Sequence, residues 1–518
     1  MTPNTPFINR ILRGDLSIIF YLSLLKLGLH LAVNATGGYG LFRDELYYIA
    51  CSKELAAGYV DHPPLSVYIL RLTTTMFGDS LFAVRLFSAI TSAASTFMIG
   101  LIAIRIGGNR LAAMAACALS FSPIYLAMGG FYSMNSIDIL IWIVVAYIMV
   151  RIVQGADRTW WIWLGITLGL GLLNKIGVLF LGAGLFAGLL LTKERRWLLT
   201  PWPYAAGVIA FALFLPYIIW NFQNSFAHLE FIHNASTQKY SSQSASTFLS
   251  GQLLLNNPMS IVLWLPGIIA LFKSKQLKQY SILAWMFIIP LLIFLINGTS
   301  KPEYLSPAFG VLFAAGSVFW SERVSVGLVW KYAFGIVMIL WMLLALATLP
   351  VVLPVMPVEK YISYSNTIGL KPESSEGKEL SELPQFYADT FGWKEKAEGV
   401  ALAFRSLSEE ERAKCAIFSN NYGRCAAIDY YGKNFGLPRA IGSHNNYWIW
   451  GLRGFTGEVL IILGGRMEDH RADFASVELV TVVKCTYCMP YENNVSVFIG
   501  RGLKQPPEKV FNDEKNFE

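Results

Sequence analysis

The stretch GLVWKYAFGIVMILWMLLALATLPVVLPVMPVEKY, residues 327–361, contains the two features that determine the fold. Residues 327–349 are almost entirely apolar and form a run long enough to cross a bilayer, which takes about 20 residues. Three prolines follow within the stretch, and proline ends a helix because it lacks the backbone N–H donor. The chain beyond them is far more charged. The stretch therefore predicts a final membrane span, a linker at 350–357 and a soluble domain at 358–518.

Apolar runs of the same kind recur along the chain. Hydrophobic residues make up 54% of its 518 residues and charged residues only 14%, whereas about a quarter of the residues of a soluble protein are charged. The chain is therefore predicted to be a polytopic α-helical membrane protein with about eleven spans and a C-terminal soluble α/β domain. The predicted spans lie near residues 16–34, 82–104, 111–129, 135–153, 159–173, 176–192, 203–221, 258–272, 280–297, 305–321 and 327–349.

The positive charges predict the orientation of these spans. Lys and Arg are frequent in one set of connections and rare in the other, and positive residues stay on the cytoplasmic side. The frequent set comprises Arg10, Arg13, Arg105, Arg110, Arg151, Arg158, Lys193, Arg195, Arg196, Lys273, Lys275, Lys278 and Arg323. The opposite short connections hold little beyond Lys239 and Lys301. The prediction is an inner-membrane protein with a cytoplasmic N-terminus and a periplasmic C-terminal domain.

The net charge of +7 does not indicate a nucleic-acid partner. A nucleic-acid footprint would be a basic patch on one face, whereas these charges are spread between apolar runs. Membrane lipids are the expected surroundings.

Two predicted non-cytoplasmic loops, 35–81 and 222–257, are too long to be simple turns. Loops of this length within a compact membrane domain, here 1–349, are usually functional. In the first loop, LSVYILRLTTTMF has apolar residues at helical spacing, which predicts an amphipathic helix along the membrane surface. A third loop on the same side, 298–304, is short.

The tail at 358–518 shows the patterns of a mixed α/β domain. KEKAEGVALAFRSL has helical periodicity, and Ser408 with Glu411 fits a capping box that opens a further helix. The runs CAIFS, EVLIIL, VELVTVV and VSVFIG are typical of short strands.

The tail also contains a lone CxxC motif, CTYC, with Cys485 and Cys488. A zinc site would need a second pair of ligands nearby, and the sequence shows none. A disulfide is therefore the favoured interpretation. Cys415 and Cys425 are a second candidate pair, although spacing alone does not show it.

Asp44 and Glu45 stand in the apolar, aromatic loop GGYGLFRDELYYIA, about ten residues after the first span. Such a pair can simply be solvated loop acids. If the segment is helical, however, adjacent side chains point about 100° apart. One carboxylate can then face a cavity while the other bonds a neighbouring loop, so the two acids are expected to have different roles.

Asp61 and His62 follow in the same loop, within DHPPL. The two prolines fix the backbone and would hold both side chains at a set angle, although a helix-starting turn also explains the motif. Together with the preceding acid pair they are candidate ligands for a divalent metal, but no spacing here is diagnostic of a metal site.

Most other polar residues of the apolar part lie on the outer face. They are Arg71, Arg85, Asn135, Asp138, Lys175, Lys301, Glu303 and Tyr304. Each alone can be an ordinary snorkelling residue. Together they mix carboxylates with cations at the depth of the lipid head groups. That mixture suits transfer of a group from a lipid phosphate, because cations stabilise the leaving phosphate and a carboxylate accepts the proton of the acceptor.

These motifs, in this order, resemble the protein O-mannosyltransferase and lipid A aminoarabinose transferase group, which is glycosyltransferase family 39 and its close relatives in the GT-C superfamily. The resemblance covers about residues 1–345. It is carried by RDELYY, YVDHPPL, FGDSLFAVRL, SMNSIDIL, LLNKIGVL, NNP and KPEYLSPAF. The tail is similar to the extracytoplasmic tails of bacterial members.

The resemblance implies an inverting glycosyltransferase. Such enzymes take a sugar from a polyprenyl-phosphate carrier at the outer face of the membrane and transfer it to a glycan, lipid or protein. By the resemblance, Asp44 is the catalytic carboxylate and Glu45 supports its loop. It also places His62, Lys175 and Lys301 near the donor phosphate or the active site.

Two features depart from these relatives. Lipid A transferases carry a basic residue where Tyr47 stands and a Lys where His62 stands, which predicts a differently built phosphate clamp and weakens the case for lipid A as acceptor. Eukaryotic O-mannosyltransferases carry a β-trefoil in a central loop. The 222–257 loop is too short for one, which weakens the case for a protein acceptor.

A membrane transporter or flippase of a lipid-linked saccharide is the alternative function. A transporter typically shows paired repeats and broken helices near the bilayer midplane. This chain concentrates its polar residues at one face, which favours an enzyme. A non-catalytic membrane scaffold for the tail fits poorly with so many ionisable residues on that face.

Overall fold

The computed structural model describes residues 14, 16–36, 38–239, 243–372 and 377–518. Arg10 and Arg13, two of the residues predicted on the cytoplasmic side, lie outside the described residues. The chain divides into two compact units. The first, called the helical unit, comprises Met1–Gly38, Phe82–Ile219 and Ser242–Pro357. The second, called the mixed unit, comprises Tyr39–Leu81, Trp220–Ser241 and Val358–Glu518.

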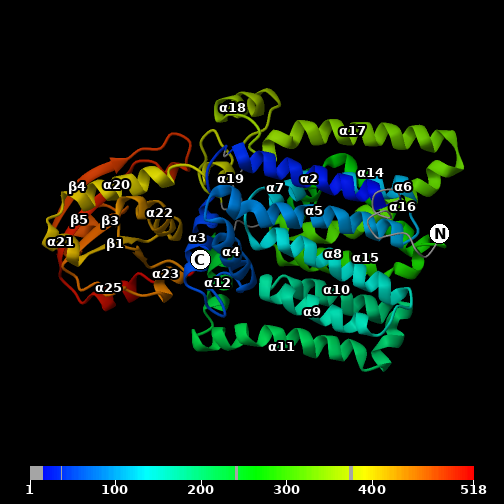
Figure 1. Ribbon diagram of the computed structural model, residues 1–518, viewed down its shortest axis with the longest axis horizontal. Helices are drawn as coiled ribbons and strands as arrows, with labels where there is room; N and C mark the ends of the chain where they lie inside the picture. Colours follow the sequence, from blue (N-terminus) through cyan, green and yellow to red (C-terminus); the bar gives the residue numbers. More distant parts are fainter. Residues whose placement is uncertain (1–13, 15, 37, 240–242, 373–376) are drawn as a thin grey trace. The chain divides into compact units, whose positions relative to one another are not determined.

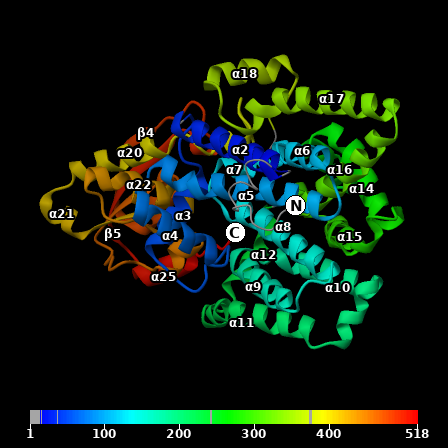
Figure 2. The same ribbon diagram turned by 45° about the vertical axis from the view of Figure 1, so that its right-hand side comes forward.

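The helical unit consists of apolar helices, the longest of which run roughly parallel to one another (Figures 1 and 2). Its α-helices are α2 (Leu16–Thr36), α5 (Leu81–Arg105), α6 (Arg110–Leu119), α7 (Pro123–Gly130), α8 (Met134–Val153), α9 (Thr159–Asn174), α10 (Val178–Leu191), α11 (Trp202–Gln223), α13 (Ala245–Leu255), α14 (Ile261–Lys273), α15 (Ile282–Asn297), α16 (Phe309–Val326) and α17 (Leu328–Val352). Short 3₁₀ helices are η1 (Lys193–Leu199), η3 (Pro258–Ser260), η4 (Lys278–Tyr280) and η5 (Pro302–Ala308).

The lengths of these helices test the predicted spans. Among the described residues, 6 helices are long and apolar enough to cross a membrane, or up to 8 if each of two bent pairs counts as one span. The helices α9, α10 and α15 coincide with predicted spans but have only 16, 14 and 16 residues, fewer than the about 20 that cross a bilayer. A multi-pass α-helical membrane protein is therefore confirmed, whereas the count of eleven is not. In addition, α17 extends to Val352, into the predicted linker.

The span predicted at 111–129 is not straight, because α6 and α7 meet at an angle of 62°. The break lies just before Pro123, the first residue of α7. A residue that precedes proline avoids the helical backbone, and Ser122 is indeed extended, with φ −60° and ψ 154°. The apolar pattern alone does not reveal this bend, although the proline marks it.

Two glycines bring α14 and α16 into close contact. A Cβ added at Gly316 would overlap the carbonyl oxygen of Leu263, and a Cβ added at Gly267 would lie 2.5 Å from the backbone nitrogen of Gly316. Small residues allow helix backbones in membranes to approach each other closely. The spacing of this helix pair therefore depends on the absence of both side chains.

Gly316→Ala is expected to lower the free energy of unfolding by about 1–3 kcal/mol, because the added methyl group overpacks a backbone contact. Thermal unfolding of the purified protein in detergent measures the change. Gly335→Ala in α17 is the matched control, since a Cβ there meets no atom within 4 Å. Equal melting temperatures for both variants would contradict the close contact.

The mixed unit combines parts of the two long predicted loops with the tail. Its helices are α3 (Arg43–Lys53), α4 (Leu65–Phe77), α12 (Ala227–Asn234), α18 (Val358–Thr367), α19 (Gln385–Ala388), α20 (Trp393–Ser406), α21 (Glu409–Lys414), α22 (Tyr422–Tyr431), α23 (Asn446–Ile449), α24 (Met467–Asp473) and α25 (Pro507–Asp513). Short segments are the π-helix η2 (Ala235–Lys239) and the 3₁₀ helices η6 (Gly432–Phe435) and η7 (Pro490–Glu492). The mixed unit thus contains residues of the two long loops together with the tail. The predicted domains, 1–349 and 358–518, are instead continuous in sequence and assign these loops to the membrane domain.

A five-stranded sheet with the order β2-β1-β3-β5-β4 forms the centre of the tail. Its strands are β1 (Cys415–Ser419), β2 (Ile441–Gly442), β3 (Val459–Leu463), β4 (Phe474–Val483) and β5 (Val495–Leu503). β1 is parallel to β2 and β3, while β5 is antiparallel to β3 and β4. All four predicted strands are present. β2, with two residues, is too short to show a sequence pattern.

Two helices pack against this sheet, which also contributes to an apolar cluster. α20 contacts β3, β4 and β5, and α22 contacts β1. A separate apolar cluster comprises Ile441, Leu460, Ile462, Phe474 and Phe498. The predicted capping box at the start of α21 is also confirmed, since Ser408 Oγ accepts from the Glu411 N–H at 3.2 Å and Glu411 Oε2 accepts from the Ser408 N–H at 3.0 Å.

The predicted amphipathic helix is α4. Its apolar side chains Tyr68, Leu72 and Met76 are 41%, 62% and 64% exposed, and their spacing of four residues places them on one side of the helix. Such a stripe fits an interfacial helix. Its position along a membrane surface stays a prediction.

The disulfide predicted between Cys485 and Cys488 is absent from the structure, in which both are free thiols. The two residues nevertheless contact each other, because Cys488 Sγ donates to the Cys485 carbonyl oxygen at 3.3 Å. A separate hydrogen bond between the two thiol groups lowers the pKa of the Cys485 thiol to about 7. Cys415 and Cys425 are free thiols as well.

Candidate active site

Asp44 and Glu45 lie in the first turn of helix α3, and Glu45 caps the start of the helix. Glu45 is fully buried, and its Oε2 accepts a hydrogen bond from the Phe42 N–H at 2.8 Å. Acidic residues in the first turn also interact favourably with the helix dipole. The contact supports the expected role of Glu45 in holding the loop.

Asp44 is the more accessible member of the pair, with 40% of its side chain exposed. Tyr422 of α22 donates its hydroxyl hydrogen to Asp44 Oδ1 at 2.7 Å, and Arg43 Nε lies 3.4 Å from the same oxygen. Arg43 is fixed in turn, because its Nη1 lies 3.6 Å from Asp389 Oδ2 and its guanidinium lies 5.4 Å from the centre of the Tyr422 ring. These contacts hold one carboxylate oxygen of Asp44.

Tyr47 connects the two halves of the first long loop to α23. Its hydroxyl donates to Asp61 Oδ1 at 3.1 Å and accepts from the Asn446 N–H at 3.3 Å. Asn446 Oδ1 also accepts from the Val60 N–H at 2.7 Å. Burial raises the pKa of Tyr47 well above its usual value, and the negative charge of Asp61 adds to this. Tyr47 therefore stays a neutral donor that orients Asp61.

His62 is buried among aromatic rings. Its imidazole stacks on Tyr48, with ring centres 4.6 Å apart and an interplanar angle of 6°, and lies 5.1 Å from the ring of Tyr59. Its Nδ1 is 3.0 Å from the Pro63 carbonyl oxygen, to which it can donate. His62 Nε2 lies 3.8 Å from Asp61 Oδ1.

A metal at the candidate ligands Asp61 and His62 would have few protein ligands. Within the described part of the chain, no group of three or more His, Cys, Asp or Glu side chains converges. Structural and catalytic metal sites usually use at least three protein ligands. A divalent metal at this pair stays an untested prediction.

A second cluster lies within the helical unit, around Lys175. Lys175 Nζ donates to Asn135 Oδ1 at 2.8 Å and lies 3.6 Å from Asp138 Oδ2. The ammonium also lies 5.3 Å from the centre of the Tyr304 ring. Asn135 and Asp138 share one face of α8 because they are three residues apart. Four of the residues predicted on the outer face therefore meet at one place.

Of the remaining predicted residues, Lys301 adjoins the second cluster, because its carbonyl oxygen accepts a hydrogen bond from the Tyr304 N–H at 3.1 Å. Lys301 and Glu303 are half-buried in the segment around η5. Arg85 is buried near the start of α5, whereas Arg71 is exposed on α4. Their roles stay predictions.

Three residues of the site were not predicted from the sequence, namely Asp389, Tyr422 and Asn446. Tyr422 contacts Asp44 from 378 positions away, a distance at which no spacing rule applies. Tyr422 and Asn446 lie in the polar–aromatic runs SNNYGRCAAIDYYG and GSHNNYWIWG, whose composition is as typical of a domain core as of a binding surface.

The chain is similar to known membrane glycosyltransferases in sequence and in fold. Residues 61–220 match the family model described as Dolichyl-phosphate-mannose-protein mannosyltransferase. Over 265 residues the chain is 23% identical to undecaprenyl phosphate-alpha-4-amino-4-deoxy-L-arabinose arabinosyl transferase 1 of Pseudomonas fluorescens. That alignment covers 48% of this chain and 46% of the relative.

The structural match extends over almost the whole chain. ArnT from Cupriavidus metallidurans in the apo state superposes with a TM-score of 0.60 at 14% identity, over 92% of this chain and 97% of that one. The fold is that of ArnT. The same protein bound to undecaprenyl phosphate gives a TM-score of 0.58. The archaeal oligosaccharyltransferase AglB from Archaeoglobus fulgidus gives 0.50 at 12% identity, over 80% of this chain and 63% of its own.

The superposition on ArnT covers 92% of the chain and therefore reaches into the C-terminal tail. The resemblance to the protein O-mannosyltransferase and aminoarabinose transferase group, which the motifs indicated, is confirmed.

Proposed function

We propose that the protein is an inverting membrane glycosyltransferase. It moves a sugar, hexosyl or pentosyl, from a polyprenyl-phosphate carrier to a glycan, lipid or protein acceptor at the outer face of the cytoplasmic membrane. The single observation that carries this proposal is the half-exposed carboxylate of Asp44, fixed through one oxygen by Tyr422 and Arg43. The other oxygen, Oδ2, has no hydrogen bond or ion pair with the described residues and can meet an acceptor.

In the proposed reaction, Asp44 accepts the proton of the acceptor hydroxyl or amine. The acceptor oxygen or nitrogen forms a bond to the anomeric carbon of the sugar, while the bond between that carbon and the phosphate oxygen breaks. The polyprenyl phosphate leaves with the bonding electron pair. Because attack and departure take place on opposite faces of the carbon, the anomeric configuration is inverted. A positioned base of this kind typically contributes about 10²–10⁴-fold to the rate.

The leaving phosphate requires positive charge. Lys175 of the helical unit is the first candidate, since Asn135, Asp138 and Tyr304 hold its ammonium in one position. Lys301 and Arg85 are further candidates. His62 is less suited, because aromatic rings enclose it.

The relatives support the proposed donor class. The Pseudomonas fluorescens relative is named as a transferase of an undecaprenyl-phosphate-linked sugar, and ArnT from Cupriavidus metallidurans binds undecaprenyl phosphate. We extend the donor class to this chain, with residues 1–349 as the catalytic membrane domain. The N-terminus would be cytoplasmic and the 358–518 domain extracytoplasmic.

Sugar and acceptor can be identified together by mass spectrometry of envelope lipids, glycans and glycoproteins from cells with and without the gene. The proposal predicts one glycosylated product that disappears with the gene, together with accumulation of its polyprenyl-phosphate donor. Unchanged glycosylation of all three classes would contradict it.

Tyr422→Phe is expected to reduce kcat for transfer by about 10–150-fold, because a hydrogen bond to a charged group is worth roughly 1.5–3 kcal/mol. The KM for the donor should stay unchanged. Tyr430→Phe is the matched control, since Tyr430 belongs to the same helix and donates to the Asp79 carbonyl oxygen instead of to Asp44. Equal rates for the two variants would show that Tyr422 does not position the carboxylate.

A further inference from the structure

The tail contains a cavity that the proposed reaction does not use. It has a volume of about 200 Å³ and lies at the carboxyl ends of the parallel strands β1 and β3, where Asn420 and Gly464 line it. In open α/β sheets this is the edge at which ligands bind. An apolar cavity of roughly 150 Å³ holds a benzene-sized molecule, so this one accommodates a ligand with a single ring.

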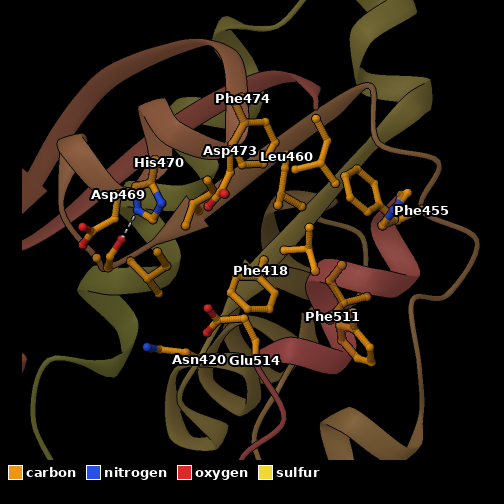
Figure 3. Close-up of a pocket in the computed structure, with 18 of the residues that line it drawn as sticks. Phe418, Asn420, Phe455, Leu460, Asp469, His470, Asp473, Phe474, Phe511 and Glu514 are labelled. Atoms are coloured by element: carbon orange, nitrogen blue, oxygen red, sulfur yellow. Dashed lines mark hydrogen bonds between the residues drawn. The ribbon is translucent and has the colours of Figure 1, made fainter. Parts of the chain in front are cut away.

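The walls of the cavity are aromatic. Phe418, Phe455, Phe474 and Phe511 come from four different segments and surround the space (Figure 3). Phe474 and Phe511 are buried, whereas Phe418 and Phe455 are half-exposed. Such walls provide apolar surface and ring faces that attract cations.

The charged groups at the cavity are acidic. Asp469, Asp473 and Glu514 line it, and no Lys or Arg does so in the part of the chain that the structure describes. Arg466 forms an ion pair with Asp469: its Nε donates to Oδ2 and its Nη2 donates to Oδ1, each at 2.9 Å. Asp473 and Glu514 have no ion pair among the described residues. In the view of Figure 3, Asp473 lies above the ring of Phe418 and Glu514 lies below it.

The histidine at the cavity is bound to the protein through one of its ring nitrogens. His470 Nε2 lies 2.9 Å from the Gly464 carbonyl oxygen, and its ring meets the edge of Phe498. The cavity therefore offers aromatic faces and two carboxylates that have no ion pair among the described residues, none of whose Lys or Arg side chains lines it.

We propose that this cavity binds a small organic cation, namely a primary ammonium group on a single-ring skeleton. The ammonium would lie between Asp473 and Glu514 and over the face of Phe418, while the ring packs against Phe455 and Phe511. Both amino sugars and simple cyclic amines have this chemistry. The proposal concerns equilibrium binding, so it stands or falls separately from the transfer reaction.

The test measures binding to the full-length protein in nanodiscs by calorimetry with two matched ligand pairs. Glucosamine is compared with glucose, and cyclohexylamine with cyclohexanol. At least one amine should bind about tenfold more tightly than its neutral partner, which corresponds to one charge-assisted contact of about 1.4 kcal/mol. Which amine binds distinguishes an amino sugar from an apolar amine.

The double variant Asp473→Asn, Glu514→Gln should remove this preference, because it keeps the shape of the cavity and removes the charge. Glu508→Gln is the matched control: Glu508 is an exposed acid of α25 that does not line the cavity. An unchanged melting temperature of the double variant verifies folding. The proposal is overturned if neither amine binds, if the neutral partners bind equally well, or if the double variant keeps the preference.

Discussion

Asp44→Asn is expected to reduce sugar transfer by about 10²–10⁴-fold, the usual contribution of a general base. Asparagine has nearly the same shape and still offers an oxygen to the Tyr422 hydroxyl, which donates to Asp44 Oδ1 at 2.7 Å. The variant should therefore fold and bind the donor normally, so that kcat falls and the KM for the donor does not. Initial rates with a purified polyprenyl-phosphate-linked sugar measure both constants.

The matched control for this variant is Asp79→Asn. Asp79 lies in the same long loop, but its carboxylate pairs with Lys433 at 2.6 Å. Losing an exposed ion pair costs little stability, and the transfer rate should stay within about twofold of wild type. Transfer at the wild-type rate by Asp44→Asn would remove this residue as the base and leave the chemistry without an assigned carboxylate.

Glu492→Gln is expected to lower the free energy of unfolding of the tail by about 3–5 kcal/mol, because it leaves buried positive charge without compensation. Glu492 is 2% exposed and Lys396 is 0% exposed. Glu492 Oε2 lies 3.2 Å from Lys396 Nζ and accepts from Arg424 Nε at 2.9 Å. Hydrogen exchange of strands β3 and β5 in the full-length protein reports the loss of stability.

Two further variants separate this buried cluster from general effects. Glu398→Gln removes an exposed pair with Lys394 on α20 and should be nearly neutral. Adding Lys396→Met to Glu492→Gln should recover part of the lost stability, because one uncompensated charge disappears with its partner. If the double variant loses more free energy of unfolding than the two single variants together, the ion cluster is not the cause.

The apolar pattern predicted the class of the protein well. Runs of about 20 apolar residues identify α2, α5, α8 and α17 almost to the residue, because the bilayer fixes their length. The shorter helices α9, α10 and α15 and the bend at Pro123 depend on packing between helices, which an apolar run does not encode.

The sequence predicted the chemical type of the site better than its contacts. Asn135 and Asp138 could be placed on one face of a helix from their spacing, and the structure adds that Lys175 meets them. The partners of Asp44 could not be found in this way. Tyr422 and Asp389 come from the tail, and contacts between distant segments are set by the tertiary fold.

The alternative of a lipid-linked saccharide transporter makes a different prediction about the donor. Two bent helix pairs, of the kind that transporters use, are present in the described chain. A transporter, however, moves the carrier without breaking the bond between sugar and phosphate. A base such as Asp44 would then have no proton to accept.

The most direct test is to follow the donor itself. The purified protein is reconstituted into proteoliposomes with a polyprenyl-phosphate-linked sugar and an envelope extract as the source of acceptor, and the lipid fraction is analysed by mass spectrometry. The account predicts that free polyprenyl phosphate appears together with a glycosylated product, and that neither forms with Asp44→Asn. Movement of intact donor between the leaflets, with no free polyprenyl phosphate, would contradict it.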